Sequence, residues 1–325
     1  MSITISAAFA TCMETPDHVV LAEEFGYERA WLYDSPALYP DVWMQLARAA
    51  ERTTRIGLGP GVLIPSLRHP MTTAAAIGTL VNLAGPERVH VGVGTGFTGR
   101  FTLGQAPLRW AAVQEWVTCV KALLDGETVE WDGGKMRMIH PAGFLPDRPI
   151  TVPFVIGAAG PKGKTVARAV GDGLILAGGS PDPDMDWQAA LMTGTVLDVG
   201  EAVSSARVFE AAGHSAAVSY HFFAENGLGV DNLPGGPEWK AAYDDLAEDE
   251  RHLAMHLEHL VAVNERDKPF ITPEIIEMFG SAWTPEQLRT RLGEMEASGV
   301  TEVVYQPAGP DVERELATFF EAAKG

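Results

Sequence analysis

Cysteine is nearly absent from this chain of 325 residues, which contains only Cys12 and Cys119, far apart in the sequence. They form no CxxC pair and no metal-ligand spacing, so a disulfide framework and a cysteine-based metal site are excluded. Two reduced thiols in a cytoplasmic protein are the simplest interpretation. No apolar run reaches the roughly 18 residues that a membrane helix needs. The start, Met1–Ile5, lacks a basic region followed by an apolar stretch, so we predict no signal peptide.

Positive charge is also scarce: 24 Lys and Arg stand against 43 Asp and Glu, for a formal net charge of −19. Such a surface repels phosphate backbones and anionic lipids, so we predict neither a nucleic-acid partner nor a membrane partner. A small-molecule substrate remains the expected partner. Any local cluster of lysines therefore stands out in this chain.

Short apolar runs alternate with amphipathic helical segments along the chain, and eight such runs read as strands. Because the runs are apolar on both faces, they predict buried parallel strands. Eight βα units in about 300 residues predict a closed (β/α)8 TIM barrel, one α/β domain over residues 1–325, with an open doubly wound sheet as the alternative. The predicted strands are Ile3–Phe9, Arg29–Asp34, Arg55–Ile64, Val89–Thr95, Ile150–Ile156, Leu174–Ala177, Ala217–Phe223 and Glu302–Tyr305.

Two segments interrupt the alternation. Asp132-Gly133-Gly134 between two alternating arms predicts a β-hairpin insertion over about 126–149. The segment of about 225–283 contains no convincing strand and predicts a helical insertion before the eighth strand, with a long helix around Trp239–Asn264. The helix after the sixth strand is expected at Val196–Ala212, ended by Gly213.

If the barrel is right, the site lies at the carboxyl ends of the strands. Ala158–Thr165 (AAGPKGKT) follows the fifth strand and nearly matches a phosphate-binding loop, but the first glycine is missing, which disfavours a nucleotide triphosphatase. Free N–H groups at a helix N-terminus, close approach at Gly160 and Gly163, and Lys162 nearby still make a phosphate cradle. A glycine-rich turn with solvated lysines is the alternative.

Two further glycine-rich segments end barrel strands. Gly94–Gly99 matches GxGxxG, but it ends a fourth strand and the next residues do not predict an immediate helix, which disfavours a Rossmann site. A turn that lets a flat ligand approach the backbone fits better. The third strand carries Gly59-Pro60-Gly61, which indicates a bulge.

Histidines are the main candidates for proton transfer. His252, His256 and His259 share one face of the predicted helix, and we interpret them as packed or substrate-pocket histidines. A metal site is the less favoured alternative, so no metal is predicted. His221, placed at the end of the predicted seventh strand, is the better acid or base by position.

Several blocks together resemble the luciferase-like monooxygenase superfamily, in particular its deazaflavin-dependent branch of the methylene-tetrahydromethanopterin reductase type. The blocks cover most of the chain in the family's order, the helical insertion excepted. They are RIGLGPGVLIPSLRHPMTTAAAIGTLVNLAGPERVHVGVGTG, AWLYDS, LLDGETVEWDGGKMRM, PITVPFVIGAAGPKGKTVARAVGDGLILAGG and TPEQLRTRLGEMEASGVTEVVYQP.

The resemblance implies an oxidoreductase that transfers a hydride between the deazaflavin F420 and an unidentified small organic substrate, and it implies a homodimer. It also implies a cis peptide at Gly61–Val62 in the third-strand bulge, against which the ring lies. The implied cofactor-binding residues are Asp34, Gly61, Val62, Thr95, Gly96, Arg100, Ala159, Gly160, Pro161, Lys162 and Gly163. The catalytic candidates are Asp34 and His221, and the substrate candidates are Ser35, Tyr39, Phe97, His256 and His259.

Two departures from the family pattern concern the substrate. Sugar-converting relatives carry His where Ser35 stands and Glu where Phe97 stands, so a different substrate is expected. The alternatives are an FMN-dependent monooxygenase of the same superfamily and a non-catalytic protein that binds flavin or deazaflavin.

Overall fold

Eight parallel strands form the central sheet of the computed structural model, which describes residues 3–325. Met1 and Ser2, on which the signal-peptide prediction partly rests, lie outside the described residues. The strand order is β3-β2-β1-β12-β9-β8-β7-β4. The strands are β1 (Thr4–Phe9), β2 (Arg29–Leu32), β3 (Gly57–Pro60), β4 (Val91–Gly94), β7 (Phe154–Gly157), β8 (Gly173–Leu176), β9 (Gln188–Thr193) and β12 (Glu302–Gln306).

The two outer strands of this order, β3 and β4, meet and close the ring. Parallel bridges pair Leu58 with Val89 and Leu63 with Val93. The Leu63 N–H donates to the Gly92 carbonyl at 2.8 Å, across the seam. The predicted (β/α)8 barrel is therefore confirmed, and the open doubly wound sheet is wrong.

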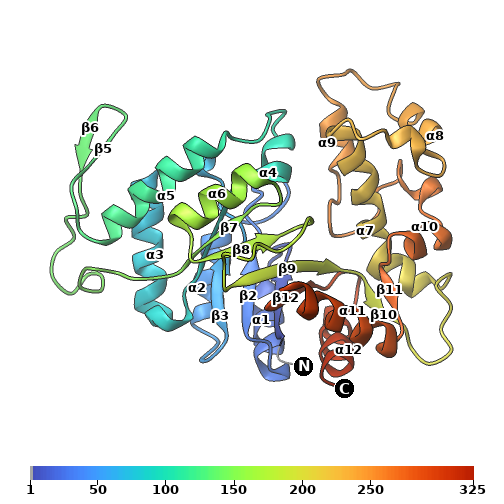
Figure 1. Ribbon diagram of the computed structural model, residues 1–325, viewed down its shortest axis with the longest axis horizontal. Coiled ribbons are helices and arrows are strands. Elements are labelled where there is room, and N and C mark those ends of the chain that lie inside the picture. Colours follow the sequence, from blue (N-terminus) through green and yellow to red (C-terminus); the bar gives the residue numbers. More distant parts are fainter. Residues whose placement is uncertain (1–2) are drawn as a thin grey trace.

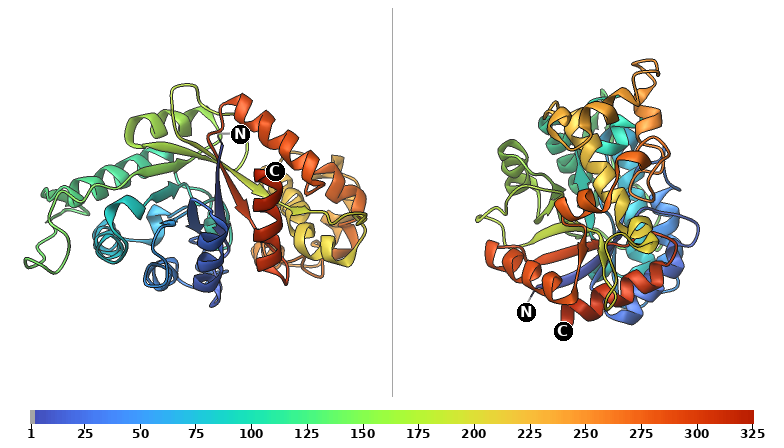
Figure 2. Two further views of the ribbon diagram at one scale, coloured as in Figure 1. Left: turned by 90° about the horizontal axis from the view of Figure 1, so that it is seen from below. Right: turned by 90° about the vertical axis from the view of Figure 1, so that its right-hand side faces the viewer.

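Helices surround the barrel (Figures 1 and 2). Local signals set several helix starts: Asp41 accepts from two N–H groups at the start of α2, and Thr284 with Gln287 forms a capping box at the start of α11. The helices against the sheet are α1 (Thr15–Phe25), α2 (Val42–Ala50), α3 (Pro70–Ala84), α5 (Trp110–Leu124), α6 (Pro161–Val170), α11 (Pro285–Ser298) and α12 (Val312–Lys324).

The seventh strand is not where the sequence predicted it. Ala217–Phe223 lies inside the helix α7 (Ala206–Glu225), and the strand is β9, formed by QAALMT. A short apolar run fits a buried helix as well as a strand, and AVSYHFF buries one helical face through Ala217 and Tyr220. The predicted helix Val196–Ala212 is helical only from Ala206, and the predicted stop at Gly213 is wrong, since Gly213 lies within α7.

Two other connections differ from the prediction. Residues 177–187 join β8 directly to β9 without a helix. The long helix expected at Trp239–Asn264 is instead broken into α8 (Gly236–Ala241), α9 (Arg251–Met255) and turns. Glu258 and Leu260 have φ of 60° and 59°, which an α-helix cannot contain.

The insertions lie on opposite sides of the barrel (Figure 1). The predicted hairpin is confirmed as β5 (Val129–Trp131) paired with β6 (Gly134–Met136). The helical insertion contains α7 to α10 (Pro273–Met278), and its two ends are joined by the parallel pair β10 (Thr195–Val196) and β11 (Ala282–Trp283). It therefore begins about 30 residues earlier than predicted.

The amino-terminal end of the barrel is closed by packed side chains. The Glu302 carboxylate accepts from Arg29 at 2.9 Å, from Trp31 at 3.1 Å and from Trp187 at 2.7 Å. The Arg29 guanidinium also lies 4.8 Å from the centroid of the Trp187 ring. This end is a structural plug, which leaves the carboxyl-terminal end for ligands.

Over residues 3–325, none of the helices combines the length and apolar character that crossing a lipid bilayer demands.

Candidate functional site

The chain that leaves β3 turns across the carboxyl-terminal end of the barrel. The Gly61–Val62 peptide is cis, which confirms the expectation at that position. A Cβ atom on Gly94 would lie 2.8 Å from Cγ2 of Val62, and one on Gly157 would lie 3.2 Å from Cγ1. The glycines that end β4 and β7 therefore make room for Val62, and segment 61–64 lies at the same end of the barrel as the residues that follow β7.

Asp34 follows β2 at this end and is 3% exposed. Its carboxylate accepts two hydrogen bonds from Arg68, at 3.0 Å from Nε and 2.8 Å from Nη2. Arg68 also donates to Asp41 at 2.9 Å. Burial alone would lower the pKa of Arg68, but its hydrogen bonds and charge interactions with the two carboxylates raise it above the ordinary value. Asp34 is thus an acceptor held by a permanent cation.

Arg68 is a site residue that the sequence did not single out for function. The signal was present, because Arg68 stands two residues before Pro70, the proline that starts α3 at the rim. The Trp116 indole donates to the Arg68 carbonyl at 3.0 Å, and this contact fixes the backbone. The neighbouring His69 has a structural role: its Nδ1 accepts from the Met71 N–H at 3.2 Å as the N-cap of α3.

The turn after β4 forms a short helix, α4 (Phe97–Phe101), where no immediate helix was expected. Gly96 precedes it with φ of 79°, and a Cβ there would lie 2.5 Å from Ile64. Arg100 donates at 2.6 Å both to the Ser66 hydroxyl and to the Ala106 carbonyl. The predicted cofactor residues Thr95, Gly96 and Arg100 therefore form a braced turn against the segment that follows β3.

The predicted phosphate cradle lies at the N-terminus of α6. Gly160 is the exposed N-cap residue, and no atom lies within 4 Å of where its Cβ would be. Gly163 is buried, and a Cβ there would lie 2.5 Å from the Trp110 ring, so only glycine fits. Among the described residues, the Lys162 ammonium makes no hydrogen bond or ion pair, whereas Lys164 donates to Ser180 at 3.3 Å. The exposed residues Ala159 and Pro161 complete this open, cationic helix terminus.

The substrate candidates lie between the barrel end and the helical insertion. The Tyr39 hydroxyl donates to the His259 carbonyl, and burial raises the pKa of Tyr39 above its ordinary value. The Phe97 ring lies 4.6 Å from that of Phe101 and 5.7 Å from that of Phe222 on α7. Ser35 is half-buried beside this turn. The insertion thus contacts the barrel end next to the loops after β2 and β4.

The histidines are arranged differently from the prediction. His252 lies in α9, but His256 follows that helix and His259 lies in the next turn, so the three do not share one helix face. His221 lies in α7 rather than at a strand end, yet its ring comes within 5.9 Å of those of His256 and His259. Burial, together with the neighbouring histidines, lowers the pKa of His259 well below its ordinary value.

These features together describe a site for a flat ligand with an anionic tail. One side offers backbone and an apolar side chain at Gly61 and Val62, the rim offers the buried Asp34, and the open terminus of α6 offers N–H groups and a free cation. Across residues 3–325, the barrel end therefore presents both a backbone platform and an open helix N-terminus with a free cation.

Comparison with known proteins agrees with this geometry. The family described as luciferase-like monooxygenase matches residues 4–302. The 5,10-methylenetetrahydromethanopterin reductase of Archaeoglobus fulgidus is 27% identical over 319 residues, covering 92% of this chain and 91% of the relative. The F420-dependent glucose-6-phosphate dehydrogenase of Beutenbergia cavernae is 35% identical over 184 residues, covering 50% of this chain and 52% of the relative.

Solved structures share the fold over the whole chain. The F420-dependent tetrahydromethanopterin reductase of Methanopyrus kandleri gives a TM-score of 0.71 at 20% identity, with 100% of this chain and 99% of the other covered. An F420-dependent secondary alcohol dehydrogenase, solved with an F420-acetone adduct, gives 0.65 at 19% identity, with both chains fully covered. With the family match spanning nearly the full length, the chain belongs to the luciferase-like monooxygenase family.

Proposed function

We propose that this protein is an F420-dependent oxidoreductase that transfers a hydride between the deazaflavin and a small organic substrate. The observation that carries the proposal is the uncapped, open N-terminus of α6 at the same barrel end as Asp34 and segment 61–64. The similarity to reductases and dehydrogenases named for F420 supports the choice of cofactor.

The described residues fit such a cofactor. No atom lies within 4 Å of where a Cβ on Gly160 would be, so this glycine leaves open space at the helix terminus. Lys162 supplies an unpaired positive charge in a chain of net charge −19. Residues 159–163 would hold the phosphate, and Gly61 with Val62 would support the ring.

The remaining predicted residues would orient the ring and the substrate. Asp34, fixed by Arg68, presents carboxylate oxygens that can accept further hydrogen bonds from the polar edge of a ring. Thr95, Gly96 and the turn braced by Arg100 would border the same ring. Ser35, Tyr39 and Phe97 would face the substrate, and the aromatic contact of Phe97 with Phe222 would exclude water.

When bound, the deazaflavin would supply the hydride chemistry, and the protein would supply binding, orientation and a fixed electrostatic environment. The Tyr39 hydroxyl already donates a hydrogen bond to the His259 carbonyl. It would therefore shape the pocket and keep its proton during the reaction. His221 donates from Nε2 to Asp267, which makes it a poor match for the acid or base role predicted from its strand position.

A binding titration tests the cofactor assignment. Oxidised F420 and FMN would be added in parallel to the purified full chain, and quenching of the cofactor fluorescence measured. We expect saturable binding of F420 at one site per chain and much weaker binding of FMN. Tighter binding of FMN would instead support the monooxygenase alternative, and binding of neither would contradict the proposal.

A matched pair of variants places the binding site. Gly160→Asp adds a negative side chain at the anion-binding terminus, where the protein itself leaves open space. Gly293→Asp adds the same side chain in α11, where a Cβ also meets no other atom. We expect Gly160→Asp to weaken F420 binding at least about tenfold, or about 1.4 kcal/mol, and Gly293→Asp to leave it unchanged. Equal effects of the two variants would contradict the cradle.

Turnover separates an enzyme from a protein that only binds the cofactor. Reduced F420 would be mixed with the full chain and a panel of ketones, imines and activated alkenes, and the return of the oxidised cofactor's absorbance followed. We expect at least one class to be reduced. Tight binding without turnover of any member would favour the non-catalytic alternative.

We also propose a homodimer, as the family resemblance implies, and a cytoplasmic location, as predicted from the two reduced cysteines. Ile139 and Phe144 support the dimer, because they expose 80% and 69% of their surface in the chain after the hairpin. Light scattering of the intact chain checks this, with a monomer at micromolar concentration as the contrary result.

A further inference from the structure

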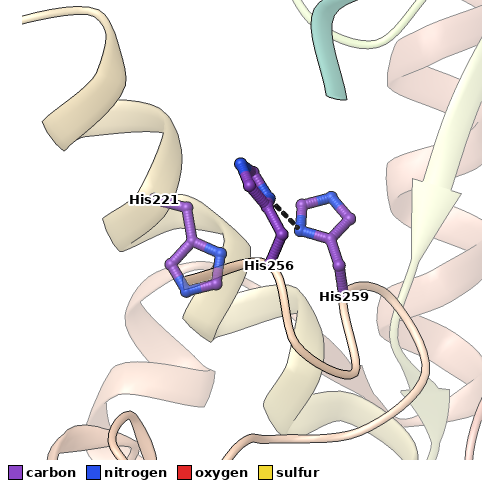
Figure 3. A group of neighbouring side chains, drawn as sticks. All are labelled: His221, His256 and His259. Carbon is purple, nitrogen blue, oxygen red and sulfur yellow. Dashed lines mark hydrogen bonds between the residues drawn. The ribbon is translucent and has the colours of Figure 1, made fainter. Parts of the chain in front are cut away.

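Three buried histidines meet inside the helical insertion. His221 comes from α7, and His256 and His259 come from the turn after α9 (Figure 3). Their exposed fractions are 2%, 2% and 5%. One ring nitrogen of each lies within 4.8 Å of those of the other two.

Two of the rings are oriented by carboxylates on their outer side. His221 Nε2 lies 2.8 Å from Oδ2 of Asp267, and His256 Nε2 lies 2.5 Å from Oε1 of Glu225. A carboxylate only accepts, so each Nε2 carries the hydrogen. In the neutral rings, Nδ1 of His221 and of His256 is therefore a lone pair, and both lone pairs lie on the inner side.

The third ring can adopt the same form. Nδ1 of His259 lies 3.2 Å from Nδ1 of His256, and its Nε2 lies 3.4 Å from the Thr98 hydroxyl. A hydroxyl both donates and accepts, so Thr98 permits either tautomer of His259. With the hydrogen on Nε2, the Nδ1 atom of each of the three histidines carries a lone pair that could bind a shared ion.

One of these lone pairs has no partner. Among the described residues, Nδ1 of His221 is buried without a hydrogen bond, and in Figure 3 a nitrogen of this ring points toward the other two rings. A buried acceptor without a donor costs free energy, and the protein supplies no donor here. An electrophile placed between the rings would satisfy it.

We propose that His221, His256 and His259 bind a Zn²⁺-class metal ion through their Nδ1 atoms. Ligands at about 2.0–2.1 Å in a tetrahedral site lie about 3.3 Å apart, close to the separation found between His256 and His259. The His221 ring must approach by roughly 1.5 Å, the difference between that spacing and the outer limit of 4.8 Å. Carboxylates behind two of the ligands are the arrangement that fixes metal-binding histidines.

Such an ion would hold the insertion against the barrel end. The turn that carries His259 already accepts hydrogen bonds from the barrel, at the His259 carbonyl from Tyr39 and at the Leu260 carbonyl from Gln306 at 2.6 Å. The metal would join this turn to α7. Three protein ligands also leave one coordination position for water or a substrate oxygen. The proposed site departs from our interpretation of these residues as packed or substrate-pocket histidines without a metal.

Zinc titration of the metal-stripped, tag-free full chain tests the site. We expect calorimetry to give one Zn²⁺ per chain, with binding lost by at least about 100-fold in His221→Ala and in His259→Ala. His252→Ala, a histidine on the same segment outside the group, serves as the control and keeps full affinity. Absence of zinc binding by the wild type, or equal binding by all three variants, overturns the proposal.

Two further measurements remain informative if the alanine variants fold poorly. Cobalt bound to the wild-type chain should show the intense visible absorption of a four-coordinate ion with nitrogen ligands, and the weak spectrum of hydrated cobalt overturns the site. Glu225→Gln keeps the side-chain shape but weakens the carboxylate behind His256, so zinc affinity should fall roughly 10-fold to 100-fold. Unchanged zinc affinity in Glu225→Gln also overturns the metal site. F420 binding is measured separately and tests only the proposed function.

Discussion

Arg68 links two carboxylates that differ in burial. The side chain of Asp34 is 1% exposed and that of Asp41 is 38% exposed, although both accept from the same guanidinium. A buried charge that loses its partner is far more costly than an exposed one. Asp34 and Asp41 therefore offer a matched test of how much each ion pair with Arg68 contributes to the free energy of unfolding.

We predict that Asp34→Asn lowers the free energy of unfolding by about 3 kcal/mol and weakens F420 binding, because Arg68 loses its bidentate partner. Asp41→Asn should cost less than about 1 kcal/mol, since asparagine also caps a helix and α2 keeps its N-cap. Urea unfolding measures both. Similar losses in the two variants would contradict the account of Asp34.

The sequence predicted several residues of the site but not their partners. Gly61–Val62 and the turn at Gly160 stand in recognisable local patterns, because a bulge and a helix start are encoded by nearby residues. Arg68 lies 34 residues from Asp34, and only the closed barrel brings the two side chains together. The contact between His221 and His259 depends in the same way on tertiary structure, because the turn after α9 must pack against α7.

At the scale of elements, the segment after β3 and the ends of β4 and β7 are mutually fitted. Val62 occupies space that side chains at Gly94 and Gly157 would take. The β-branched valine has little rotational freedom with which to move away. The glycine and the valine should therefore be energetically coupled.

We predict that Gly94→Ala destabilises the protein by about 1–3 kcal/mol through overpacking against Val62. Adding Val62→Ala should recover part of that loss, so the double variant should be more stable than the sum of the single changes predicts. A double-mutant cycle from urea unfolding gives the coupling. Strict additivity would show that the two elements are not fitted at this point.

Elements with explicit end signals were predicted well, and ambiguous ones were not. The capping box at Thr284 and the hairpin at Asp132 fix their elements locally. QAALMT and AVSYHFF are both short apolar runs, and only tertiary packing decides that the first is β9 and the second belongs to α7. Glu258 and Leu260 end a helical pattern without glycine or proline, so the sequence carried no strong stop there.

At the scale of the whole molecule, the plug at the amino-terminal end makes stability depend on pH. His90 lies within this plug, 5.5 Å from the Trp187 ring between centroids, and burial, then the charge of Arg29, lowers its pKa from 6.5 to about 4. The unfolded chain therefore binds a proton that the folded chain rejects. The contribution of His90 to the free energy of unfolding is therefore fully present above about pH 6.5, and it is lost as the pH falls toward about 4.

For His90 alone, the linkage amounts to about 2 kcal/mol between about pH 8 and about pH 5. We predict that His90→Gln, although less stable overall, loses about 2 kcal/mol less than the wild type over this range. Urea unfolding at the two pH values measures the difference. An equal acid-induced loss in both proteins would mean that His90 is not held neutral in the plug.

The central claim is that one end of the barrel holds a flat deazaflavin between segment 61–64 and the N-terminus of α6. A crystal structure of the full chain with F420 tests it most directly. We predict the ring beside Gly61 and Val62, its polar edge near Asp34, and the phosphate on residues 160–163. A ring bound elsewhere, or a phosphate that does not contact α6, would contradict the account.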